Sequence, residues 1–166
     1  MKQQSFKPGL SKYVPLIVIF TLIVALTWIK SYFNAEAALM AVMADFMAFF
    51  FLIFGAFKVI NLSGFVKAYQ MYDLLAKKSR LYAYLYPFLE VGLGVAYLAR
   101  FELFWVNWVT LIVMLVSALG VARELAKGHK IVCACLGAVF LIPMTKVTLL
   151  EDLLMAVMAA VMLWIM

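Results

Sequence analysis

The run Ala37–Ile60 reads AALMAVMADFMAFFFLIFGAFKVI, and Asp45 and Lys58 are its only charged side chains. A helix needs about 20 predominantly apolar residues to cross the hydrocarbon core of a bilayer. Three further runs meet the same requirement: Val14–Phe33, Leu81–Ala99 and Leu103–Ala122. The sequence therefore predicts an all-α protein built from membrane-spanning helices.

The composition excludes a water-soluble globule and a disordered chain. Of the 166 residues, 69% are hydrophobic and 13% are charged, whereas about 25% of residues are charged in ordinary soluble domains. The formal net charge is +6, but the Lys and Arg residues stand at the ends of the apolar runs. That placement is typical of membrane orientation, so we expect contact with membrane lipid and no nucleic-acid partner.

The last part of the chain is less regular. Ile131–Met144 is apolar for only 14 residues, a length more typical of an interfacial or re-entrant segment. Thr148 and Glu151 have the spacing of a capping box, in which the two side chains satisfy the first amides of a helix. That helix would run to Met166 as a last span, so we predict an integral membrane helical bundle of five spans.

The basic residues predict the orientation of the bundle. Twelve of the 14 Lys and Arg residues fall on one side of the predicted spans: Lys2, Lys7, Lys12, Lys58, Lys67, Lys77, Lys78, Arg80, Arg123, Lys127, Lys130 and Lys146. Such an excess marks the cytoplasmic side, so we expect a multi-pass protein of the bacterial inner (cytoplasmic) membrane with a cytoplasmic amino terminus. Ala35-Glu36-Ala37 also imitates a signal-peptide cleavage site, which leaves removal of the first span open.

Two cysteines carry the most specific local pattern, Cys133-Ala134-Cys135-Leu136-Gly137, which begins four residues after His129. A disulfide across so small a ring departs from preferred geometry and is readily reduced, which favours thiol–disulfide exchange without a cofactor. The two thiolates and His129 could instead bind Cu(I) or another soft metal. A third interpretation is that both cysteines are inert apolar side chains.

Asp45 and Glu90 place two acidic groups deep within the second and third spans. An ionisable group at the bilayer centre costs on the order of 3 kcal/mol unless it is protonated, paired or turned inward. Because the two spans are consecutive and antiparallel, the carboxyls could meet and share a proton or bind a cation. Lys58 is expected to extend to the headgroups, and Gly92 and Gly94 to let neighbouring helices approach closely.

The stretch from Asp45 to the end resembles the MauE/DoxX-like family of redox-associated membrane proteins. The resemblance rests on the order of these elements: Gly55-Ala56-Phe57-Lys58, Gly64-Phe65, Tyr69, Tyr72, Pro87-Phe88-Leu89-Glu90 and Cys133-Ala134-Cys135-Leu136-Gly137. It implies a four-helix membrane domain over residues 37–166, with residues 1–36 forming an added basic segment and first transmembrane helix.

The same resemblance implies a function. Cys133 and Cys135 would be a redox pair, with Glu90 in the core of the bundle, in a protein that supports the maturation of other proteins beside a thioredoxin-like partner. The charge bias puts the two thiols on the reducing, cytoplasmic side. We therefore expect a thioredoxin- or glutaredoxin-like protein as the exchange partner.

Overall fold

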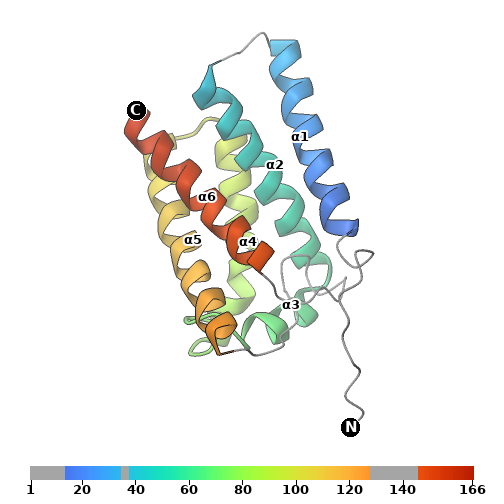
Figure 1. Cartoon of the computed structure of the whole chain (residues 1–166), viewed down its shortest axis with the longest axis vertical. Helices are drawn as coiled ribbons and strands as arrows, with labels where there is room; N and C mark the ends of the chain where they lie inside the picture. Colours follow the sequence, from blue (N-terminus) through green and yellow to red (C-terminus); the bar gives the residue numbers. More distant parts are fainter. Residues whose placement is uncertain (1–13, 35–37, 128–145) are drawn as a thin grey trace.

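The computed structural model describes residues 14–34, 38–127 and 146–166, and within these ranges it contains helices and no strand. The helices are α1 (Val14–Asn34), α2 (Leu39–Ile60), α3 (Leu62–Tyr69), α4 (Arg80–Leu98), α5 (Leu103–Ala126) and α6 (Lys146–Ile165). The five long helices run alternately up and down, and the short α3 lies at the end of the bundle where α1 begins (Figure 1).

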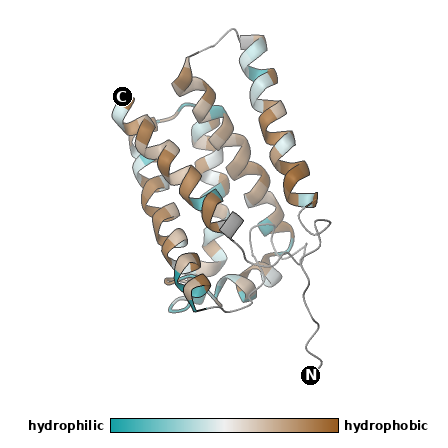
Figure 2. Cartoon of the chain, viewed as in Figure 1, coloured by the Kyte–Doolittle hydropathy of each residue, from teal (hydrophilic) through white to brown (hydrophobic). Residues whose placement is uncertain are grey.

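Four helices in the described ranges are long and apolar enough to cross a membrane: Val14–Phe33, Leu39–Ile60, Arg80–Leu98 and Leu103–Ala126. They coincide with four of the five predicted spans. The fifth prediction corresponds to α6, a helix of 20 residues that is not among those four. Figure 2 shows hydrophobic residues along the long helices, and Trp28, Trp105 and Leu119 are exposed on them. The chain is a multi-pass membrane protein.

Helix α2 is the centre of the bundle. It is apolar on all sides, the pattern of a helix surrounded by other helices, and it contacts α1, α3, α4 and α6. Its buried residues include Met47, Phe51 and Phe54, which belong to the main hydrophobic core. Helix α5 packs chiefly against α6, whereas α1 contacts only α2 among the described helices.

A glycine sets the close approach of α2 and α4. A Cβ added at Gly94 would lie 2.8 Å from Leu52 Cγ and 3.1 Å from the Ala48 carbonyl oxygen. Because the neighbouring backbone is so near, only a residue without a side chain fits there. The matching expectation for Gly92 is wrong, since a Cβ there would meet nothing within 4 Å.

The connection from α2 to α4 folds inward. Asn61 Oδ1 accepts a hydrogen bond from the Gly64 amide and begins α3, and Ser79 Oγ accepts one from the Tyr82 amide and begins α4, as capping residues do. Between them, the aromatic side chains of α3 are buried against α4 in a second hydrophobic cluster. The aromatic residues of this connection therefore reinforce the bundle.

Candidate functional site

Lys58 and Glu90 form an ion pair inside the bundle. Lys58 Nζ lies 2.5 Å from Glu90 Oε1 and 2.6 Å from Oε2, and both residues are buried. The ammonium also lies 5.6 Å from the ring centre of Phe65 and 5.2 Å from that of Tyr86, within the range of cation–π attraction. The prediction that Lys58 extends to the headgroups is therefore wrong.

The position of Lys58 follows from helical spacing. Phe51, Phe54 and Lys58 are separated by three and four residues, so they share the inward face of α2. A lysine on that face is almost completely buried, and it needs an opposite charge nearby. Glu90, on the facing side of α4, supplies it.

Asp45 forms ion pairs with two other basic residues, toward the opposite end of α2 from Lys58. Its Oδ1 lies 2.6 Å from Lys30 Nζ on α1 and 2.9 Å from Arg100 Nη2, just beyond α4. Asp45 and Lys58 are 13 residues apart on α2, about 20 Å along the helix axis. The predicted meeting of Asp45 with Glu90 is therefore wrong, because each carboxylate pairs with a basic group at its own level.

Arg100 reaches Asp45 from an unusual backbone conformation. Its φ is 56°, and Glu102 in the same short turn has a φ of 41°. The left-handed region costs a residue with a side chain roughly 1–2 kcal/mol. Arg100 Nη2 also donates to the Ala41 carbonyl oxygen at 3.1 Å, so bonds to α2 offset that strain and tie the α4–α5 turn to α2.

Helix α6 carries two more acids, of which Glu151 is buried and Asp152 is partly buried. Ser117 Oγ of α5 donates to Asp152 Oδ2 at 2.9 Å. Glu151 is 5% exposed, and its Oε1 is buried without a hydrogen-bond partner among the described residues. The predicted capping box is wrong, because α6 already begins at Lys146, before Thr148.

The end of the bundle around α3 carries an aromatic cluster and a further ion pair. Tyr69 lies 4.9 Å from Phe65 and 4.6 Å from Tyr86 between ring centres. Burial raises the pKa of Tyr69 well above its ordinary value of 10.0. Lys77 Nζ lies 2.7 Å from Glu124 Oε1, so the connection before α4 is joined to the last turn of α5.

The predicted thiol site lies outside the described residues. His129, Cys133 and Cys135 fall in residues 128–145, between α5 and α6. The described ranges hold no group of three or more His, Cys, Asp or Glu side chains that could hold a metal ion. Both the redox and the soft-metal interpretations of this segment remain predictions.

The partners of the buried acids are what sequence reasoning missed. The charge pattern used the Lys and Arg residues only to orient the bundle, with Lys30 and Arg100 as the two exceptions on the opposite side, and Lys58 was expected at the headgroups. The sequence did contain the information needed to expect a pair between Lys58 and an acid, because ionisable groups within membrane spans pair with one another. Lys58 lies in the same run as Asp45, and the next run contains Glu90.

Comparison with known proteins assigns the family. No curated protein and no solved structure matches the chain. Residues 36–165 match the family described as methylamine utilisation protein MauE. The match covers most of the 166 residues and agrees with the order of motifs and with the apolar helices of the structure. This multi-pass membrane protein therefore belongs to the MauE family.

Proposed function

We propose that this protein takes part in thiol–disulfide exchange with a thioredoxin- or glutaredoxin-like partner and thereby supports the maturation of other proteins. The observation that carries the proposal is the pair Cys133 and Cys135, separated by one residue in a member of the MauE family. A disulfide in so small a ring is strained and easily reduced. Such a pair suits exchange better than structural bracing.

The proposed step conserves atoms and electrons. The thiolate of one cysteine attacks a sulfur of the partner's disulfide, forming a mixed disulfide and releasing the partner's second thiolate, which takes up a proton. The other cysteine then attacks the mixed disulfide. The partner leaves as a dithiol, and Cys133 and Cys135 are left as a disulfide. Because that disulfide is easily reduced, the same two steps run in reverse with a dithiol partner, which is then oxidised. The basic groups of Lys127, His129 and Lys130 are close to the cysteines in the sequence and would favour the attacking thiolate.

We propose the bacterial inner membrane as the location, with the amino terminus and both thiols on the cytoplasmic side. The distribution of Lys and Arg supports this orientation. The two exceptions, Lys30 and Arg100, both bind Asp45, so their charges are compensated on the opposite side. A cytoplasmic thioredoxin- or glutaredoxin-like protein is then the accessible partner.

We further propose that α6 is the fifth span and that residues 37–166 form a four-helix domain to which α1 is added. Helix α6 has 20 residues, about 30 Å at 1.5 Å per residue, and runs antiparallel beside α5 (Figure 1). Helix α1 contacts only α2 among the described helices, and the family match begins at residue 36.

The exchange proposal is tested with the variants Cys133→Ser, Cys135→Ser and the double variant. Each single variant, incubated with a thioredoxin or glutaredoxin variant that keeps only its attacking cysteine, activated as a mixed disulfide with thionitrobenzoate, and quenched with acid, should release thionitrobenzoate and accumulate a mixed disulfide on a non-reducing gel. The double variant is the matched control and should form none, because the chain contains only these two cysteines. Absence of mixed disulfides in both single variants contradicts the mechanism, as does full biological function of the double variant.

The orientation is tested with a maleimide that cannot cross the membrane. Intact cells should leave the thiols unlabelled, and opened cells should give labelling that disappears in the double serine variant. Labelling from outside intact cells contradicts the cytoplasmic location. Purified protein that carries copper bound through Cys133, Cys135 and His129 would favour the soft-metal interpretation instead.

A further inference from the structure

Helices α1 and α6 enclose a long apolar groove. Both helices contact α2, but neither contacts the other. Two cavities of about 480 and 510 Å³ lie in the space between them. Val24 of α1 and Leu154 of α6 line both cavities, so the two cavities adjoin each other within the groove. It extends along α1 from Leu16 to Ser31, about 22 Å at 1.5 Å per residue.

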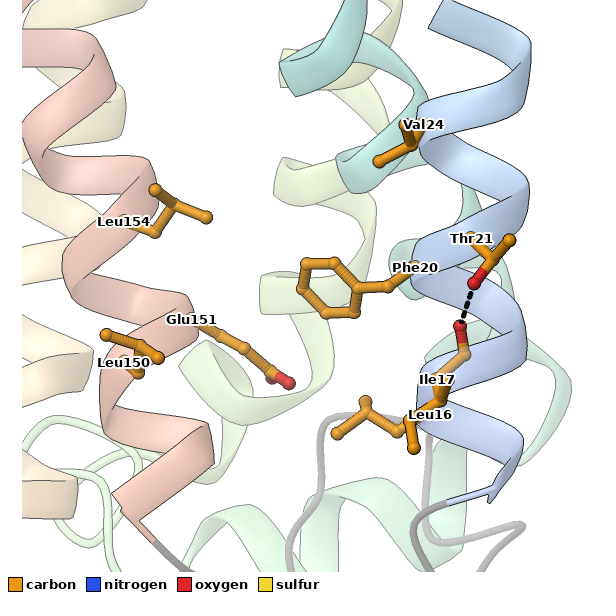
Figure 3. A pocket seen from close by; sticks show the side chains of 8 residues that line it. All are labelled: Leu16, Ile17, Phe20, Thr21, Val24, Leu150, Glu151 and Leu154. Atoms are coloured by element: carbon orange, nitrogen blue, oxygen red, sulfur yellow. Dashed lines mark hydrogen bonds between the residues drawn. The ribbon is translucent and has the colours of Figure 1, made fainter.

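One carboxyl group points into this apolar space. Figure 3 shows Glu151 extending from α6 toward Phe20 and Leu16 of α1. Its Oε1 is buried and has no hydrogen-bond partner among the described residues. The nearby Thr21 hydroxyl is already used, since it donates to the Ile17 carbonyl oxygen at 2.8 Å. A buried oxygen that lacks a donor is destabilising, and a bound molecule with a hydroxyl group would remove that penalty.

The shape and charge of the groove restrict what can occupy it. Its length fits one extended hydrocarbon chain, and its volume is in the ordinary range of small-molecule sites. Glu151 is the only ionisable side chain among the described residues that line it. Phosphate is normally bound by Arg or Lys, and no Arg or Lys is among the described residues that line the groove. A phospholipid headgroup would therefore bring a negative charge beside a carboxyl group.

We propose that the groove binds an uncharged, lipid-soluble molecule with one long hydrocarbon chain and a hydroxyl-bearing head, and that the hydroxyl donates to Glu151. The head lies at the α3 end of the groove, and the chain extends past Val24 and Leu154 toward Ser31. Both a reduced quinone and a monoacylglycerol have this chemistry. Neither the site nor its occupant depends on Cys133 or Cys135.

The test uses the full chain in phosphatidylcholine nanodiscs with photoreactive probes that carry a diazirine in the hydrocarbon chain. One probe is a decyl-substituted hydroquinone, the second a monoacylglycerol and the third a phosphatidylglycerol. Labelled peptides are quantified by mass spectrometry. Labelling of α1 and α6 by either neutral probe, but not by phosphatidylglycerol, supports the proposal. The neutral probe that labels more strongly shows whether the ligand is a quinol or a monoacylglycerol.

Two variants test the groove itself. Val24→Trp fills its midpoint, and Val18→Trp is the matched control, since Val24 is 55% exposed, Val18 is 59% exposed and only Val24 lines the cavities. We expect labelling to fall about tenfold in Val24→Trp and to stay unchanged in Val18→Trp; tenfold corresponds to about 1.4 kcal/mol. Equal labelling of the two variants overturns the proposal.

Two further variants test the hydrogen bond. Glu151→Leu removes the acceptor and should also reduce labelling about tenfold, whereas Glu151→Gln keeps an acceptor oxygen and should retain it. Loss of labelling in both variants overturns the claim that a neutral head group donates a hydrogen bond to residue 151. Preferential labelling by phosphatidylglycerol overturns the claim that the ligand is uncharged. The double Cys133→Ser, Cys135→Ser variant should be labelled like the wild type, so failure of the exchange mechanism is distinguishable from failure of this site.

Discussion

The ammonium of Lys58 donates to both carboxylate oxygens of Glu90, which joins the end of α2 to the middle of α4 inside the bundle. Both charges are almost completely buried, so each depends on the other for compensation. The pair also lies beside the aromatic cluster of α3 and α4. The ion pair therefore joins α2, α4 and the connection between them at one point inside the bundle.

Removing one partner of this pair should destabilise the protein strongly. Lys58→Met leaves the carboxylate of Glu90 buried without a cation, and Glu90→Met leaves the ammonium without an anion. Loss of one member of a buried pair typically costs about 3–5 kcal/mol. We expect a loss of that order in the free energy of unfolding of each variant, measured by denaturing-detergent titration in mixed micelles.

The double variant Lys58→Met, Glu90→Met is the control for this prediction. It removes both charges and replaces them with apolar side chains, so it should be more stable than either single variant. If the two single losses simply add in the double variant, the pair is not the source of the destabilisation.

The packing of α2 on α4 gives a second prediction. Gly94→Ala places a Cβ against the Leu52 backbone nitrogen at 3.0 Å, and such overpacking costs typically about 1–3 kcal/mol. Gly92→Ala on the same helix meets open space and should be neutral or stabilising by up to about 1 kcal/mol. Detergent unfolding compares the two variants, and equal losses would contradict the packing argument.

The boundaries of the helices were largely predictable from the sequence. Val14–Phe33 matches α1 within one residue, and Leu81–Ala99 matches α4 within one residue at each end. The fourth span was predicted to end at Ala122, but α5 continues to Ala126. A search for apolar runs stops at Arg123 and Glu124, whereas the helix continues because Glu124 turns inward and pairs with Lys77.

The partners of the charged residues were not predictable in the same way. Depth within a span placed Asp45 and Glu90 near the bilayer centre, and helical spacing gave the face of each residue. Neither gives the register between two helices. That register depends on the contact of Gly94 with Leu52, which places Glu90 beside Lys58. Asp45 then lies too far from Glu90 and pairs with Lys30 and Arg100 at the opposite end.

Asp45 should control how firmly α1 is held. Asp45→Asn removes the carboxylate that binds Lys30 and Arg100, and because those cations are partly exposed the loss should be about 1–3 kcal/mol. Helix α1 contacts only α2 among the described helices, so it should loosen first. Hydrogen exchange should accelerate in α1 and stay unchanged in α6; uniform acceleration would contradict this role.

Tyr97 should stabilise the contact between α4 and α5 through its hydroxyl. The hydroxyl lies 2.7 Å from Asn107 Oδ1 and 3.1 Å from Thr110 Oγ1, and all three residues are buried. Tyr97→Phe leaves polar atoms of α5 without this partner, at a cost of about 1–3 kcal/mol in the free energy of unfolding. Tyr32→Phe is the control, since Tyr32 is 74% exposed, and a similar loss there would contradict the assignment.

Tyr69 should make the protein sensitive to alkaline pH. Burial raises the pKa of its phenol above 10.0, and Asp73 and neighbouring tyrosines act in the same direction. The folded state therefore favours the neutral phenol, and the unfolded state releases its proton near pH 10. The stability that Tyr69 contributes is complete below about pH 10 and is lost as the pH rises toward its folded-state pKa. In detergent unfolding, the free energy of unfolding of Tyr69→Phe should fall less steeply above pH 10 than that of the wild type. If the two free energies fall in parallel with rising pH, Tyr69 is not the source of the alkaline sensitivity.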